Sequence, residues 1–276
     1  MAKLTRRMWL GIGVATVASA PLSVRTLAQE KHRGHTQPAT PGTQTTEPGN
    51  DPAPGGEAYL TDGGPRDTRI RFYRDIALMR GHLLIGGQLL ELGLWDEALP
   101  HFLHPTEELY GLMEKYIQLH GMRPFRRELQ ALAQAVKAKR KGAYEQALKV
   151  ALQRMDAALD VAKRFMKPLL GFTARTAGEV LKVALSEYEA SIEDGRFAKP
   201  VEYQDGRGFV LEAERMLEAA APELAKADAD ALARMRAALA KLKAAWPAPM
   251  PPAAPILQPG ELSALVSDVE LHASRY

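Results

Sequence analysis

Between residues 65 and 276 the apolar side chains recur at helical intervals, and glycine or proline interrupts them at short distances. Apolar residues three and four positions apart build one buried face of a helix, whereas no run shows the alternation of a strand bounded by hairpin turns. The sequence therefore predicts an all-α fold, a helical bundle of two related helical-hairpin halves at about 65–170 and 171–276. The expected helices are 66–92, 94–102, 105–120, 125–141, 144–166, 176–194, 201–221, 228–246 and 261–274.

The two predicted halves share a near-repeat around a glycine that ends a helix. After each glycine come an aromatic residue, a proline and then two polar residues that stand three positions apart. The polar pair is His101 and His104 after Gly93, and Glu202 and Asp205 after Gly195. Residues three apart lie on the same side of a helix. The halves thus present potential metal ligands at matching positions.

Three further polar residues extend this set. His82 precedes Gly93 by eleven residues and Glu187 precedes Gly195 by eight, a difference close to one helical turn. Glu108 shares a face with the two histidines if their helix continues through Pro105. Helical bundles hold metals with carboxylates and imidazoles that project inward from facing helices. The candidate ligands are His82, His101, His104, Glu108, Glu187, Glu202 and Asp205, a nitrogen and oxygen set that suits iron, zinc, copper or manganese.

A purely structural role explains the same residues in another way. Pro105 interrupts the helix that a shared face requires, and the two histidines then cap a helix end. Glu108 is then a favourable charge in a first turn, and Glu202 stands where capping alone places an acid after Pro200. For each residue alone the structural reading is the stronger one. The repetition of the set in both halves favours metal binding.

Composition excludes several classes of site. The chain has no cysteine, so it forms no disulfides, thiolate metal sites, cysteine nucleophiles or covalently attached c-type haem. The formal net charge is +3, to which the basic residues of the first 28 positions contribute, and it gives no support for nucleic acid binding. No nucleophile elbow, zinc-protease motif, phosphate loop or dinucleotide fingerprint is present, so we expect no enzyme activity.

The first 64 residues differ from the rest of the chain. Residues 1–28 join a basic start to a short apolar run and a small residue, which predicts an export signal rather than a membrane span. The order Thr5-Arg6-Arg7 resembles a twin-arginine signal, and the general export route remains the alternative. Residues 29–64 are rich in proline, glycine and threonine and predict a flexible linker, in which His32 and His35 form a solvated pair. We therefore expect a periplasmic protein that is not an integral membrane protein.

Two consecutive motifs resemble a known family. Residues 186–196 read Ser-Glu-Tyr-Glu-Ala-Ser-Ile-Glu-Asp-Gly-Arg, and residues 201–210 read Val-Glu-Tyr-Gln-Asp-Gly-Arg-Gly-Phe-Val. Over about 183–212 this progression resembles the periplasmic helical region fused to bacterial high-affinity iron permeases. The chain lacks the membrane helices of those permeases and their Arg-Glu-x-x-Glu motif, so it is not the channel. The resemblance implies a soluble periplasmic component of iron or related metal uptake. The positions it carries over are Glu187, Tyr188, Glu202, Tyr203 and Asp205.

Two functions of different classes remain open at this point. In the first, the protein captures iron or another divalent metal and passes it to a membrane permease or another periplasmic protein, with release aided by protonation of histidine. This function predicts that His101, His104, Glu202 and Asp205 meet within a few ångströms. In the second, the chain is a metal-free scaffold that binds a partner protein. Residues 92–98 resemble helical-repeat adaptors, and this function predicts scattered polar residues beside an exposed apolar groove.

Overall fold

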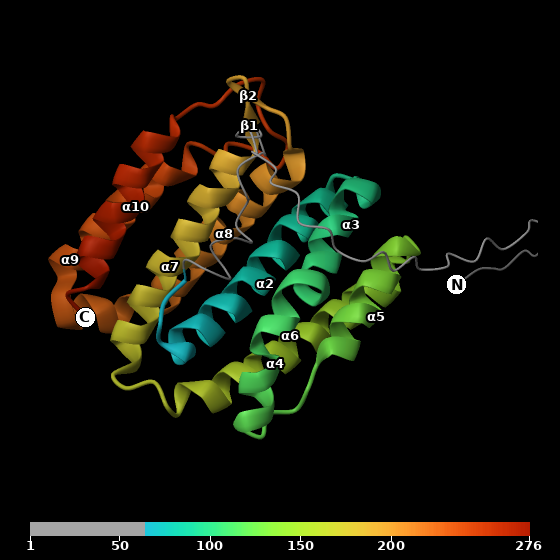
Figure 1. Cartoon of the computed structure of the whole chain (residues 1–276), viewed down its shortest axis with the longest axis horizontal. Coiled ribbons are helices and arrows are strands. Elements are labelled where there is room, and N and C mark those ends of the chain that lie inside the picture. Colours follow the sequence, from blue (N-terminus) through green and yellow to red (C-terminus); the bar gives the residue numbers. More distant parts are fainter. Residues whose placement is uncertain (1–63) are drawn as a thin grey trace, which may run out of the picture. The chain divides into compact units, whose positions relative to one another are not determined.

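A computed structural model describes residues 64–276, and these residues form helices with one short hairpin (Figure 1). The predicted all-α helical bundle is thereby confirmed. The predicted export signal, the linker up to residue 63 and the pair His32 and His35 lie outside the described residues.

The helices follow one another along the chain with short connections. The first part contains α2 (Thr68–Glu91), α3 (Trp95–His104), a π-helical turn η2 (Pro105–Leu109), α4 (Tyr110–Leu119), α5 (Arg126–Lys137) and α6 (Lys141–Lys163). The second part contains α7 (Leu169–Ala190), the strands β1 (Ile192–Glu193) and β2 (Arg196–Phe197), α8 (Pro200–Ala219), α9 (Ala221–Lys243) and α10 (Pro259–Ala273). Figure 1 shows α2, α7 and α8 running side by side, and α10 lies against the outer side of α7.

Helix α2 is the central element, because it packs against α3, α6, α7 and α8. Its side chains are buried around most of its circumference, and Ile76, Leu78, Met79 and Ile85 are fully inaccessible to solvent. A helix that is enclosed by neighbours buries any polar residue it carries, and such a residue needs a partner inside the protein. His82 lies in this enclosed stretch and is buried.

Two glycines let α2 and α8 approach closely. A Cβ atom built on Gly81 of α2 would lie 2.6 Å from the ring of Phe209, and one built on Gly208 of α8 would lie 2.8 Å from the carbonyl carbon of Gly81. Any larger side chain at either position therefore pushes the two helices apart. His82 directly follows Gly81 on α2, and Asp205 lies about one helical turn before Gly208 on α8, so the close approach sets how near these two side chains come.

Several boundaries differ from the sequence prediction for local reasons. The predicted helix 176–194 begins earlier, directly after Pro168, and ends at Ala190, because Asp194 and Gly195 adopt positive φ and close the hairpin that pairs β1 with β2. The stretch 222–227, predicted as a connection, is helical. At Asp228, where a new helix was predicted to start, the backbone of α9 leaves the helical conformation. The Asp228 side chain there accepts a hydrogen bond from the backbone N–H of Ala231, as at a helix start.

The chain does not break at Pro105. Helix α3 passes into η2 and then α4, and the N–H of Tyr110 bonds to the carbonyl of Pro105, five residues earlier. This single wide turn adds a residue to the helix and thereby accommodates the proline. His104 and Glu108 consequently remain on one continuous helical segment, which the shared-face argument required.

Candidate metal centre

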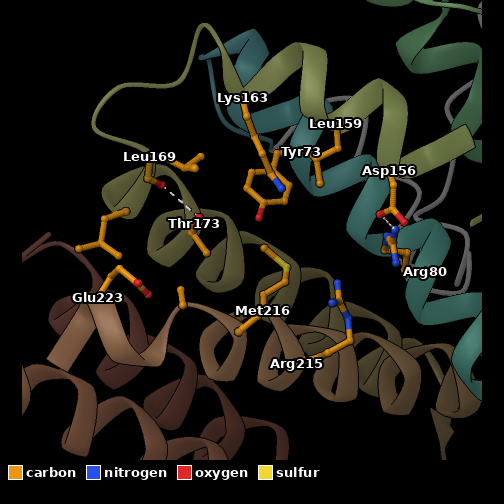
Figure 2. A pocket seen from close by; sticks show the side chains of 13 residues that line it. Tyr73, Arg80, Asp156, Leu159, Lys163, Leu169, Thr173, Arg215, Met216 and Glu223 are labelled. Atoms are coloured by element: carbon orange, nitrogen blue, oxygen red, sulfur yellow. Dashed lines mark hydrogen bonds and ion pairs between the residues drawn. The ribbon is translucent and has the colours of Figure 1, made fainter. Parts of the chain in front are cut away.

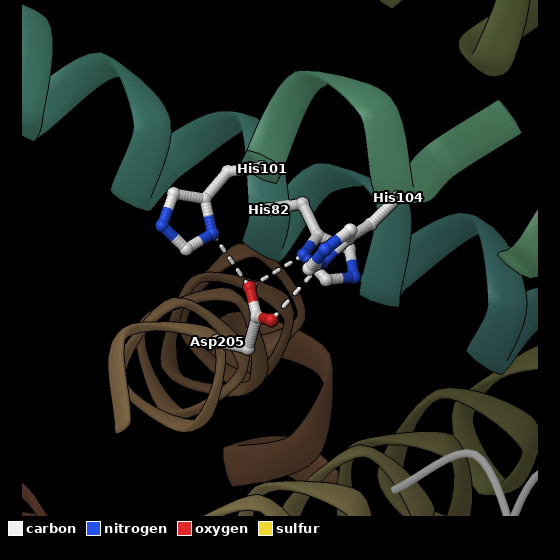
Figure 3. Close-up of side chains that lie close together, drawn as sticks. All are labelled: His82, His101, His104 and Asp205. Carbon is white, nitrogen blue, oxygen red and sulfur yellow. Dashed lines mark hydrogen bonds and ion pairs between the residues drawn. The ribbon is translucent and has the colours of Figure 1, made fainter. Parts of the chain in front are cut away.

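A buried group of four metal-ligating side chains lies where α2, α3 and α8 meet. His82 comes from α2, His101 and His104 come from α3, and Asp205 comes from α8 (Figure 3). One ligand atom from each of these residues lies within 4.8 Å of the others. His101, His82 and Asp205 are buried, and His104 is the partly exposed member.

The carboxylate of Asp205 is the centre of the group. Its Oδ1 atom lies 2.6 Å from Nδ1 of His82 and 2.7 Å from Nδ1 of His101, and its Oδ2 atom lies 3.2 Å from Nδ1 of His104. A carboxylate accepts hydrogen bonds only, so each Nδ1 carries the proton it donates. Figure 3 shows the three rings around the carboxylate. Three imidazoles thus turn the same ring nitrogen towards one buried negative charge.

The outer nitrogens of two histidines also have acceptors. Nε2 of His101 lies 2.9 Å from Oε1 of Gln204, and Nε2 of His104 lies 3.5 Å from Oε1 of Glu108. An imidazole that binds a metal through one nitrogen generally donates the other N–H to a carboxylate or carbonyl oxygen. Both outer contacts therefore suit imidazoles that bind a metal through Nδ1.

Burial and mutual charge perturb the titration of the group. Burial disfavours the charged form of Asp205, but the three histidines outweigh it and hold the pKa of Asp205 well below its usual value. Burial lowers the pKa of His82 despite the adjacent carboxylate. Burial also opposes the charged form of His104, yet its hydrogen bond to Asp205 and the nearby acids Glu107 and Glu108 raise its pKa to about 9. At neutral pH the group holds an ionised Asp205, a neutral His82 and a protonated His104.

The dimensions of the group fit a transition metal ion after small side-chain adjustments. Metal–nitrogen and metal–oxygen bonds of about 2.1 Å place neighbouring ligands about 3.0 Å apart or more and opposite ligands no more than about 4.2 Å apart. The ligand atoms here lie within 4.8 Å of one another, so the widest pair must close, and the hydrogen-bonded pairs of Asp205 with His82 and His101, at 2.6 and 2.7 Å, must open. Three imidazoles and one carboxylate are a donor set for iron, zinc, copper or manganese.

The other predicted ligands lie at different places. Glu108 lies in η2 next to His104, at the partly exposed edge of the group, and contacts His104 without belonging to the central four. Glu202 is half-buried in the first turn of α8, and Glu187 is half-buried near the end of α7. Neither Glu187 nor Glu202 belongs to a group of three or more potential ligands within the part of the chain that the structure describes.

Different faces of α8 meet α2 and α7. A Cβ atom on Gly208 would meet α2, whereas one on Gly206, two residues earlier, would meet the carbonyl of Ala184 on α7. These two positions are about 200° apart around α8, although α2 and α7 also contact each other directly. Asp205 reaches α2 and α3, and Glu187 on α7 is not among the described side chains that meet there.

Sequence analysis missed Gln204, which contacts His101 directly. Its amide nitrogen also lies 3.5 Å from the sulfur of Met250, a residue of the proline-rich segment between α9 and α10. The available signal is its place in the Glu-Tyr-Gln-Asp motif, directly before Asp205. Gln204 is buried beside Asp205 and links the group to Met250 in that segment.

A cavity of about 380 Å³ on the other side of α2 is shown in Figure 2. Its cations already have carboxylate partners: Arg80 pairs with Asp156, Arg215 makes two bonds to Glu212, and Lys163 lies 3.8 Å from Asp160. Because these charges are compensated locally, the cavity presents no convergent free charge to a ligand. The His and Asp group is therefore the stronger candidate site.

Comparison with known proteins gives a match for the second part of the chain. None of the curated proteins and none of the solved structures matches the chain significantly. Within the described residues, no helix carries an apolar stretch long enough to cross a bilayer. Residues 169–275, which comprise α7 to α10, match the family model of the iron permease-associated 4-helix bundle domain, and the resemblance to iron permease regions is thereby confirmed.

Proposed function

We propose that this protein binds one divalent transition metal ion, with iron as its cargo, through His82, His101, His104 and Asp205. The observation that carries the proposal is the convergence of three imidazole Nδ1 atoms on one buried carboxylate. Burying a carboxylate together with three histidines costs free energy. A metal ion that replaces the protons between the nitrogens and the oxygens would offset that cost.

The role in uptake rests on the family match of residues 169–275. We infer that the protein acts in the periplasm and hands its metal to a membrane iron permease. Asp205 lies in the matched region and the three histidines lie before it, so the complete site needs both parts of the chain. The predicted export signal is consistent with this location. The proposal assigns a binding function and no catalytic step.

Capture and release follow from the protonation of the group. His104 has a pKa of about 9 and must lose a proton before its nitrogen binds an ion, so metal binding releases a proton near neutral pH. Acidification returns protons to the imidazoles and weakens binding. His104 and Glu108 lie at the partly exposed edge, which makes that edge the route of access.

Metal titration of the full chain tests the proposal. The variant His32→Gln/His35→Gln serves as background, since those histidines lie in the predicted linker. We expect one equivalent of metal per chain, and loss of that equivalent in His101→Gln and in Asp205→Asn. His272→Gln on α10 is the matched control, because His272 lies outside the group, and it should bind like the background.

Affinity alone does not identify the cargo. Nitrogen and oxygen sites generally bind copper and zinc more tightly than iron or manganese, whichever metal they carry in the cell. The link to iron is tested by measuring iron uptake in cells that express the protein or its Asp205→Asn variant. Equal uptake with both, or equal metal binding by background and Asp205→Asn, would contradict the proposal.

A further inference from the structure

A second cavity of about 510 Å³ lies between the first turns of α2 and helix α4. It is separate from the candidate metal centre, because Arg74, which lines it, precedes His82 by eight residues, about 12 Å along the helix axis. Its volume is within the range of small-molecule sites. Neither the metal proposal nor the family match assigns it a role.

One wall of this cavity carries a buried arginine that is only partly satisfied. Arg74 is 1% exposed, and its Nε and Nη2 atoms both approach Oδ1 of Asp75, at 2.9 and 2.8 Å. Its Nη1 atom is buried and has no hydrogen-bond partner. A buried guanidinium N–H without an acceptor is unfavourable, and an incoming oxygen would relieve that cost.

A second lining residue, Tyr116, carries a donor of the same kind. The hydroxyl of Tyr116 on α4 is buried and has no partner. Its ring is held between Phe72, at 4.6 Å between centroids, and His120, at 4.0 Å, and both rings are nearly parallel to it. The stack restrains the ring of Tyr116 and limits how far its hydroxyl can move.

The charge and polarity of the cavity favour an organic anion. Three cations, Arg71, Arg74 and Lys115, line it, and among its described lining residues Asp75 is the one carboxylate. Asp75 is already engaged with Arg74. The remaining wall is mainly apolar, with Leu112 and Leu119 strongly exposed at the rim. Three cations thus share one lining carboxylate here, whereas the three cations that line the cavity of Figure 2 are accompanied by two, Asp156 and Glu223.

We propose that this cavity binds a small organic carboxylate. One carboxylate oxygen accepts from Nη1 of Arg74 and the other accepts from the hydroxyl of Tyr116, and the apolar body of the ligand packs against the leucines and Met113. Arginine and tyrosine donors in an apolar pocket provide both the charge and the direction that a carboxylate requires. A modest movement of the two buried side chains towards the cavity admits the ligand.

The test is calorimetric titration of the full chain with benzoate and with hexanoate, and with benzamide as the uncharged counterpart of benzoate. We expect saturable binding of at least one carboxylate with a Kd below about 1 mM and much weaker binding of benzamide. Tyr116→Phe removes the unpartnered hydroxyl and retains the stack, and it should weaken carboxylate binding about tenfold. Tyr144→Phe, on α6 and outside the cavity, is the control and should bind like the wild type.

Three results would overturn the proposal. They are the absence of saturable binding of both carboxylates, equal binding of benzoate and benzamide, or unchanged affinity in Tyr116→Phe. Arg74→Gln combined with Asp75→Asn removes the buried ion pair as a unit, so it avoids an isolated buried carboxylate. If that double variant folds, it should also lose binding. If the double variant does not fold, the affinity of Tyr116→Phe alone tests the proposal.

Discussion

At the scale of single residues, Asp205 determines the charge state of its neighbours. Its carboxylate accepts hydrogen bonds from three histidines, and it is the main reason that His104 holds a proton at neutral pH. In Asp205→Asn the charge disappears while the burial of His104 persists. Burial then opposes the imidazolium while Glu107 and Glu108 still favour it, so the pKa of His104 should fall from about 9 towards its usual 6.5. Proton NMR of the histidine ring signals measures this shift, and His272 is the internal reference.

The same residues make the stability of the metal-free protein depend on pH. The folded-state pKa of His104 is raised, so its contribution is fully present below pH 6.5, the unfolded value, and is lost as pH rises towards 9. The loss amounts to at most about 3 kcal/mol. The pKa values of His82 and Asp205 are lowered by folding, so their contributions are lost as pH falls.

Urea unfolding over a pH series measures this dependence. We expect a maximum near pH 6.5, with a decline on the alkaline side that Asp205→Asn abolishes. A free energy of unfolding that is constant between pH 6.5 and 9 would contradict the protonated state of His104.

At the scale of helices, the close crossing of α2 and α8 holds the candidate metal centre together. A Cβ atom at Gly208 would collide with the backbone of Gly81, so Gly208→Ala must separate the two helices. We expect a loss of stability of about 1–3 kcal/mol and weaker metal binding, because Asp205 moves away from His82. The control is Gly111→Ala in α4, where a Cβ meets nothing within 4 Å and the helix should gain about 0.5–1 kcal/mol.

Thermal and urea unfolding, each followed by a metal titration, distinguish these two substitutions. The interpretation of the crossing is wrong if Gly208→Ala retains both its stability and its metal affinity. It also fails if Gly208→Ala and Gly111→Ala change stability in the same direction and by the same amount.

Most helices could be predicted from the sequence, because their signals are local. Apolar spacing indicates the helices, and Gly93 and Gly121, which adopt positive φ, mark helix ends. The continuation through Pro105 could not be predicted. Whether a proline ends a helix or is absorbed by a π-turn depends on what the surrounding helices stabilise. The hairpin was also not predicted, although its turn signal, Asp-Gly, is local. The flanking strands are two residues each and too short to alternate.

The site was predicted in part, for a reason that lies in helix phase. His101, His104 and Asp205 were selected by a three-residue period, and they do meet. The same period selected Glu202, but the side of α8 that faces α2 and α3 contains Gln204, Asp205, Gly208 and Phe209. Periodicity shows which residues share a face, whereas the direction of that face is set by the packing of α8 against both α2 and α7. The relation of the two halves as a repeat stays a prediction.

At the scale of the whole molecule, the candidate metal centre joins parts that are distant in the chain. Asp205 lies more than one hundred positions after each histidine, at sequence separations of 123, 104 and 101 residues. A bound metal therefore connects α2 and α3 to the region matched by the family model, and it binds only when both are folded. Metal should consequently stabilise the described helices as one cooperative unit.

Differential scanning calorimetry measures this stabilisation. At a free zinc concentration about one hundred times the Kd, the free energy of unfolding should rise by about 2.7 kcal/mol, and a single transition should move to higher temperature. Asp205→Asn should show no shift, and His272→Gln should shift like the wild type. Zinc is the first probe because it has no redox chemistry, and ferrous iron under anaerobic conditions follows. If metal instead splits the transition in two, α2 and α3 unfold independently of α8, and the three histidines cannot share an ion with Asp205.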